Sequence, residues 1–249
     1  AAGEVFGVCR DHSAAEVRGG GAGALIAGGK AGGHGEMDHA FNAFWNNHRT
    51  RIEISVATEK ELQAKKEECH RKKIGLTSYL IAEFIKDTEN KNDIGIAVDG
   101  RLDGNRCMGN QATGISVSYR YNRKKDLISN AAKIDYDIKK KLSNSKYKYF
   151  ILHFMAAFDG TLIDAVNLEY SKAFTSKVSK KLATVLGYGG KTKDLSITNL
   201  TTIDIPTVYD ELCIDNVIFV PPVISNGKNV VGIVTANNKM IIARHYYEE

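Results

Sequence analysis

Residues 229–247, NVVGIVTANNKMIIARHYY, combine two strand-like runs with a turn signal between them. Two runs rich in Val and Ile, NVVGIVTAN and KMIIARHYY, meet at the pair Asn237-Asn238. Asparagine tolerates positive φ angles, which the tightest turns between antiparallel strands require. The stretch therefore predicts two strands joined by a tight hairpin.

Strand patterns continue upstream of this hairpin. LSITNL (195–200) and CIDNVIFV (213–220) predict two further strands, and DIGIAVDGR (93–101) and ATGISVSYRY (112–121) predict two more. In RIEISVA (51–57) apolar residues alternate at Ile52, Ile54 and Val56. This period of two predicts a strand with one buried face.

Helical patterns occupy the intervals between these strands. Thr58 and Glu61 have the spacing of a capping box and predict the start of a helix over residues 59–73. Further helices are predicted at 39–48, 78–88, 123–142, 148–158 and 167–186. Strands and helices are segregated in the second half. The order predicts an α/β two-layer sandwich, with a mixed β-sheet and helices packed on one face.

Composition changes near residue 48 and suggests two parts. Residues 1–35 hold eleven of the 23 glycines, whereas the chain after Arg49 is rich in Lys, Asn and Ile. We therefore divide the chain into a glycine-rich segment, 1–48, and a folded region, 49–249. The run GGGAGALIAGGKAGG lacks the P-loop arrangement because Ala31 follows Lys30, so a flexible linker is the simpler interpretation.

Charge and cysteine content narrow the class of protein. The net charge of +5 is compatible with an anionic small molecule or a nucleic acid, but a solvated lysine-rich surface is the favoured explanation, and nucleic-acid motifs are absent. The four cysteines have no C-x-x-C spacing and predict free thiols: Cys9, Cys69, Cys107 and Cys213. With no apolar run long enough to span a membrane, we expect a cytoplasmic protein.

Three groups of segments resemble the superfamily of chloramphenicol acetyltransferase, alcohol acetyltransferases and the condensation domains of nonribosomal peptide synthetases. Residues 51–84 are similar to the strand–helix–helix segment that begins its C-terminal lobe. The segments GIAVDGR and MGNQATGISVSY are similar to two consecutive strands of the superfamily, of which the first ends in arginine and the second follows a GN pair. The third group is the strand LSITNL with the closing hairpins. Thr201 stands where the family has glycine, and the N-terminal lobe is absent or reduced to residues 1–49.

The resemblance implies that the protein is an acyltransferase, and it indicates which residues would form the active site. GHGEMDH (33–39) matches the HxxxD motif, with His34 as the general base and Asp38 as the residue that holds the loop. Thr198 and Asn199 are the candidates for the facing wall, where the substrate and a hydrogen-bond donor to the oxyanion belong. Acyl-CoA or a carrier-protein thioester is the expected co-substrate, and an alcohol or amine the acceptor. No bound cofactor and no metal are expected.

Several alternatives stay open. His-x-x-x-Asp occurs often by chance, and Thr198 and Asn199 also suit ordinary strand-end positions. His153 precedes Asp159-Gly160, but its spacing is two residues too long, and its apolar neighbours predict a core or boundary position. The chain could instead be a truncated, inactive lobe that serves as a binding or interaction module. A third possibility is a homo-oligomer in which a neighbouring chain supplies the missing wall.

Overall fold

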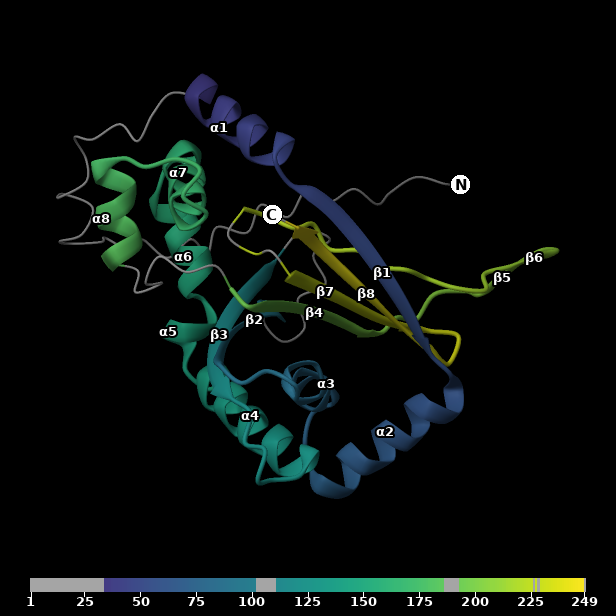
Figure 1. Cartoon of the computed structure of the whole chain (residues 1–249). Coiled ribbons are helices and arrows are strands. Elements are labelled where there is room, and N and C mark those ends of the chain that lie inside the picture. The colour runs from purple at the N-terminus through teal and green to yellow at the C-terminus, as the bar shows by residue number, and fades with distance from the viewer. Residues whose placement is uncertain (1–33, 102–110, 186–192, 226, 228, 249) are drawn as a thin grey trace.

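A computed structural model describes residues 34–101, 111–185, 193–225, 227 and 229–248. Figure 1 shows their helices and strands around one large sheet. The helices are α1 His34–Asn46, α2 Glu59–Lys72, α3 Leu76–Ile85, α4 Leu127–Leu142, α5 Ser145–Lys148, α6 Phe150–Ala157, α7 Gly160–Tyr170 and α8 Lys177–Val185. The strands are β1 Arg49–Ala57, β2 Lys91–Asp99, β3 Ala112–Arg120, β4 Leu195–Thr202, β5 Val208–Tyr209, β6 Leu212–Cys213, β7 Asn229–Ala236 and β8 Lys239–Glu248.

The hairpin predicted at residues 229–247 forms the centre of the sheet. β7 and β8 pair antiparallel, and the turn residues Asn237 and Asn238 have φ angles of 47° and 58°. All residues of β7 after Asn229 are buried. The prediction of a tight turn with positive φ angles is therefore confirmed.

The six-stranded sheet is mixed, as the sequence predicts. Its order is β1-β8-β7-β4-β2-β3. β4 runs parallel to both β2 and β7, and the remaining neighbours are antiparallel. Strand β1 lies at one edge and β3 at the other.

The main hydrophobic core lies between the sheet and the helices α2, α3 and α4, which are seen below the sheet in Figure 1. Leu80, Ile81 and Ile134 from the helices meet Ile94 and Ile197 from the sheet. Thr58 and Glu61 form the predicted capping box at the start of α2. The two-layer α/β arrangement predicted from the element order is confirmed.

The opposite face of the sheet is partly covered by irregular chain and by α1. A Cβ added at Gly232 would lie 2.3 Å from the Phe219 carbonyl oxygen, so the segment 217–223 crosses the sheet in close contact. Phe44 of α1 packs with Val230 and Tyr247 beside this segment. The sequence prediction of a strand at 213–220 is wrong beyond Cys213, because this segment lies on the face of the sheet and adds no strand to its ladder.

Helix α1 also joins a second cluster formed by the helices α7 and α8. Met37 and Ala40 pack with Ala165, Leu168 and residues of α8. The predicted single helix at 167–186 is instead two helices, because Lys172 adopts a left-handed φ of 61° and ends α7. The boundary proposed at residue 48 stays a prediction, although α1 packs against both α7 and the main sheet.

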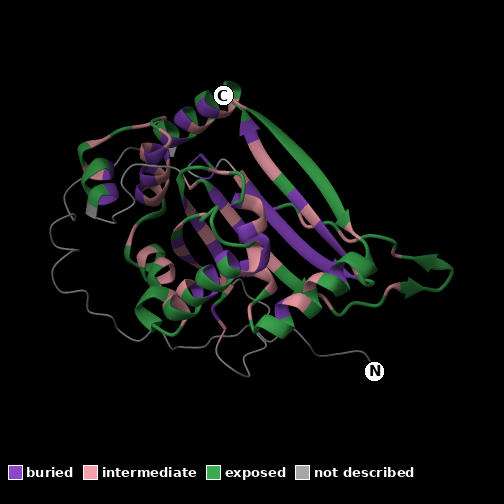
Figure 2. Ribbon diagram, turned by 60° about the horizontal axis from the view of Figure 1, so that its bottom comes forward, coloured by how far each residue is buried: buried purple, intermediate pink, exposed green. Residues whose placement is uncertain are grey.

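The apolar stripe of β1 is exposed, which corrects the prediction of a half-buried strand. Ile52, Ile54 and Val56 are 52%, 49% and 50% exposed. Among the described strands it is paired only with β8, and Figure 2 shows it as exposed along most of its length. Alternation correctly predicts the strand, but its position at the edge of the sheet decides its burial.

Candidate functional site

The HxxxD sequence lies in α1 rather than in a loop before a helix. The helix begins at His34, so positions 34 and 38 are one helical turn apart. Asp38 and His39 are exposed, whereas Met37 is 2% exposed and anchors the helix in the cluster with α7. The side chain of His34 lies outside the described part of the chain, so its assignment as the base stays a prediction.

Thr198 and Asn199 lie on opposite faces of the sheet. Asn199 faces the helices, and its Nδ2 donates to Thr77 Oγ1 of α3 at 3.0 Å. Thr198 pairs with Gly232, and therefore points to the face on which α1 and segment 217–223 lie. The two residues thus do not form one wall, and only Thr198 shares a side of the sheet with α1.

Asn199 also shapes the irregular end of β4. Its Oδ1 accepts a hydrogen bond from the backbone N–H of Thr201 at 2.8 Å, and the pairing of β4 with β7 shifts register between Asn199 and Thr202. Thr201 has a φ of 59°. This left-handed backbone explains why glycine suits the position in the related motif, and why Asn199 has a structural role here.

A buried carboxylate that the sequence analysis did not single out connects helices α3 and α4. Asp135 of α4 accepts hydrogen bonds from the Gly75 N–H and the Ser78 hydroxyl, both at 2.9 Å, and pairs with Lys139 at 2.6 Å. Burial raises the pKa of Asp135, but the hydrogen bonds from Lys139, Gly75 and Ser78 outweigh it and hold the pKa below its usual value. An acidic residue among the apolar positions of an amphipathic helix is the sequence signal for such a group.

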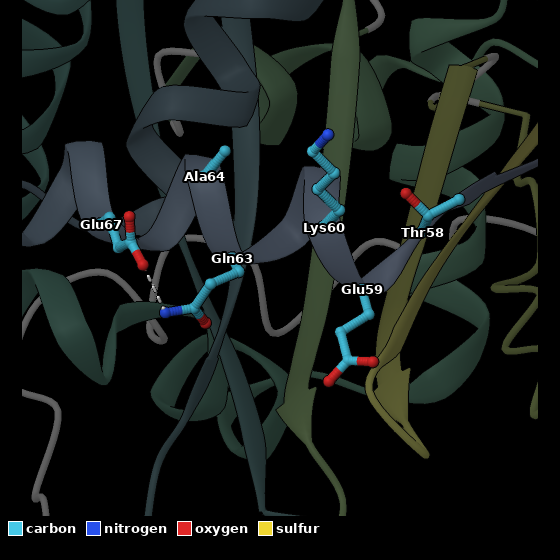
Figure 3. A pocket seen from close by; sticks show the side chains of 6 residues that line it. All are labelled: Thr58, Glu59, Lys60, Gln63, Ala64 and Glu67. Atoms are coloured by element: carbon cyan, nitrogen blue, oxygen red, sulfur yellow. Dashed lines mark hydrogen bonds between the residues drawn. The ribbon is translucent and has the colours of Figure 1, made fainter.

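Two surface hollows lie away from the predicted site. One follows the exposed side of α2, and Figure 3 shows its lining residues on this helix and its N-cap Thr58, with Gln63 bonded to Glu67 at 2.8 Å. Because no second element faces these side chains, the hollow offers little to surround a ligand.

The second hollow is lined by four strands and the end of α3. Asp194 and Arg244 contribute charged groups, and Phe84, Leu195 and Val231 contribute apolar surface. It lies where β4 and β7 begin, whereas Thr198 and Asn199 lie further along β4. Neither hollow includes Asp38, Thr198 or Asn199.

The other candidate groups give no alternative centre. His153 is exposed on α6, so the expected core or boundary position is wrong; the helix turns this residue to solvent while Phe154 packs toward α7. In the described ranges, no three His, Cys, Asp or Glu residues are arranged to hold a metal ion. Of the two cysteines described, Cys69 is buried and Cys213 is exposed, and both are free.

A search for helices that could cross a membrane found none among the described residues. No protein-family model matches the sequence. No curated protein matches it either.

Solved structures, in contrast, share the fold. The trichothecene 15-O-acetyltransferase TRI3 from Fusarium sporotrichioides has a TM-score of 0.53 and 10% identity, and the match covers 86% of this chain and 49% of that one. The EpoB cyclization-docking bidomain from Sorangium cellulosum has a TM-score of 0.51 and 11% identity, with coverage of 83% and 38%. The nonribosomal peptide synthetase FmoA3 has a TM-score of 0.51 and 10% identity, with coverage of 80% and 19%.

These likenesses define the class of fold. The chain has an acyltransferase-like fold shared with an acetyltransferase and with nonribosomal peptide synthetase domains. It spans less than half the length of each of these structures. The likeness therefore concerns about one half of the acetyltransferase and smaller shares of the other two proteins.

Proposed function

We propose that the protein transfers an acyl group from a thioester, either acyl-CoA or an acyl carrier protein, to an alcohol or amine. The observation that carries this proposal is the fold shared with the acetyltransferase over most of this chain. The position of an HxxxD sequence in α1, on the side of the sheet to which Thr198 points, supports it.

In this reaction His34 acts as the general base. Its imidazole takes the proton from the acceptor hydroxyl or amine while the acceptor attacks the thioester carbonyl carbon. The tetrahedral intermediate then expels the thiolate, which receives the proton from the imidazolium. Thr198 is the candidate donor to the oxyanion, and Asp38, one turn after His34, is the candidate to orient the imidazole.

The test measures free thiol released from acetyl-CoA and longer acyl-CoA molecules in the presence of a panel of alcohols and amines. We expect His34→Ala to lower the rate by at least about 100-fold, the usual scale for removal of a general base. His39→Ala is the matched control, because this exposed histidine of the same helix has no assigned role. Equal rates for His34→Ala and the wild type would remove His34 from the mechanism.

The second candidate function is a binding or interaction module without turnover. The engagement of Asn199 by Thr77 and the N–H of Thr201 favours it, because a group committed to the scaffold is not free for substrate. Isothermal titration with CoA, and with a carrier protein bearing phosphopantetheine, separates the two candidates. Binding without thiol release from any acyl donor supports the module, whereas thiol release that depends on an acceptor supports the enzyme.

A further inference from the structure

The outer edge of β1 is open to a further strand. β1 pairs with β8 over nine residues, Arg49 to Ala57, and within the described part of the chain no strand lies on its other side. Every residue before Ala57 is exposed. Figure 2 shows the strand along the margin of the sheet with no helix drawn over its outer edge. Natural proteins usually protect a long edge strand, because its free N–H and C=O groups pair readily with another chain.

Two of the three charged residues of β1, Arg51 and Glu53, do not protect this edge, because they are bonded back to β8, and the third, Arg49, is the first residue of the strand. Arg51 pairs with Glu248 at 2.9 Å. Glu53 accepts a hydrogen bond from the Tyr246 hydroxyl at 2.7 Å and lies 3.8 Å from Arg244. The opposite face of the strand carries the exposed apolar stripe of Ile52, Ile54 and Val56. From Thr50 to Ala57 the edge is thus rich in β-branched residues, and its two charged side chains are paired with β8.

We infer that β1 is the dimer interface of this protein and pairs antiparallel with β1 of a second copy. A two-fold axis through Ile52 places Ile52 opposite its own copy and Thr50 opposite Ile54. In the same register each Arg51 faces the Glu53 of the other copy, so the symmetry produces two identical cross-strand ion pairs. Together with Glu248 and Arg244, these residues form a row of alternating charge across the seam.

Charge complementarity selects this register from the neighbouring ones. An axis at Glu53 would place two glutamates opposite each other, and an axis at Arg51 would do the same with two arginines. Like charges in directly opposed positions are destabilising. An axis at Ile54 avoids repulsion but places Glu53 opposite Ser55, without an ion pair. A second copy therefore fits the edge best when Ile52 lies on the axis, and the two apolar stripes then lie side by side.

The first experiment tests the register by cross-linking of the full chain. In a background of Cys9→Ser, Cys107→Ser and Cys213→Ser, the variants Ile52→Cys, Glu53→Cys and Ile54→Cys are oxidised and separated by non-reducing electrophoresis. Directly opposed residues of antiparallel strands have Cα atoms about 4.5–5.5 Å apart, which is within the Cα–Cα range of a disulfide, so Ile52→Cys should form the covalent dimer in the highest yield. A higher yield at position 53 or 54 would overturn the proposed register.

The second experiment tests the interface by charge reversal. Sedimentation over a range of concentrations should show a dimer for the wild type, and Arg51→Glu should raise its dissociation constant by about tenfold or more, because both symmetric pairs become repulsive. The double variant Arg51→Glu with Glu53→Arg restores the cross-strand pairs and should recover dimerisation. Circular dichroism confirms that each variant is folded. A wild-type monomer at every concentration, or a dimer indifferent to Arg51→Glu, would overturn the inference, and neither result depends on acyltransferase activity.

Discussion

At the residue scale, Asp135 shows how one buried carboxylate fixes the helical layer. It lies on α4 and binds both the N–H of Gly75, which precedes α3, and the Ser78 hydroxyl. Its partner Lys139 is one turn further along α4. Because burial of an unpaired charge is unfavourable, these contacts together favour the ionised form of this carboxylate.

Replacement of Asp135 by Asn should lower the free energy of unfolding by about 1–3 kcal/mol, because the ion pair and the charge-assisted hydrogen bonds are lost. Urea denaturation measures the change. Asp137→Asn is the matched control: its pair with Lys133 on the same helix lies at the surface, and its loss should alter stability by less than about 1 kcal/mol. An equal effect of the two substitutions would contradict the role of Asp135.

The same carboxylate predicts a dependence of stability on pH. The folded state lowers the pKa of Asp135 from its ordinary 3.8, so on acidification the unfolded chain binds the proton first. The stabilisation is complete above the ordinary pKa and is lost as the pH falls through the lower, folded value. The difference in unfolding free energy between wild type and Asp135→Asn should therefore be constant near neutral pH and shrink below about pH 4. A difference that persists unchanged in acid would contradict this expectation.

Thr201 allows a test of backbone strain. Its φ of 59° is unfavourable for a β-branched residue, whereas glycine adopts it freely. Thr201→Gly should therefore raise the free energy of unfolding by about 0.5–1 kcal/mol. Thr202→Gly is the control, because the neighbouring threonine is paired in the strand with Thr235 and should lose stability by a similar amount. The same sign for both substitutions would refute the assignment of strain to Thr201.

At the element scale, the segment 217–223 covers part of one face of the sheet although it has no regular secondary structure. It crosses β7 at Gly232, where the absence of a side chain admits the Phe219 backbone and the ring of Pro221. The Pro221 carbonyl oxygen also lies 2.8 Å from His245 Nδ1 on β8. These contacts attach the segment to the central hairpin.

Gly232→Ala should therefore destabilise the fold by about 1–3 kcal/mol, the range for an overpacked contact. Its Cβ would lie 2.3 Å from the Phe219 oxygen and 2.4 Å from Pro221 Cδ. Gly114→Ala is the matched control, because the added Cβ would meet its nearest atom, the Ile96 oxygen, at 3.6 Å. Thermal denaturation compares the two, and a tolerated Gly232→Ala would show that the segment moves freely.

The boundaries of the elements show where sequence patterns are sufficient. The capping box at Thr58 and the asparagine turn at 237–238 depend on contacts within a few residues, and both were correctly predicted. The sequence does not predict the break between α7 and α8, because the left-handed position there is occupied by Lys172 and not by glycine, the usual signal for such a backbone. The apolar run after Cys213 resembled a strand, since periodicity reports burial and not hydrogen-bond partners.

At the scale of the whole molecule, the open edge of β1 predicts a stability that depends on concentration. If the dimer forms through β1, the thermal midpoint of the wild type should rise with protein concentration, because association stabilises the folded state by mass action. The midpoint of Arg51→Glu should change less over the same range. Differential scanning calorimetry measures both, and a wild-type midpoint that is independent of concentration would count against the dimer.

For the candidate site, the sequence predicts individual residues but not their arrangement in space. The spacing of His34 and Asp38 and the strand containing Thr198 and Asn199 were identified from motifs. Their mutual arrangement was not, because Thr198 and Asn199 alternate across the sheet and Asn199 is bonded to Thr77. A motif specifies neighbours along the chain, whereas a site requires groups brought together from separate elements.

The sequence by itself determined the order and type of most elements, the mixed α/β class and the central hairpin, because local φ preferences, capping and apolar periodicity act over a few residues. The position of β1 at an edge with its isoleucines exposed, and the burial of Asp135 between α4 and α3, follow only from the tertiary structure. Both outcomes depend on which distant segments pack together, and burial is a property of that packing.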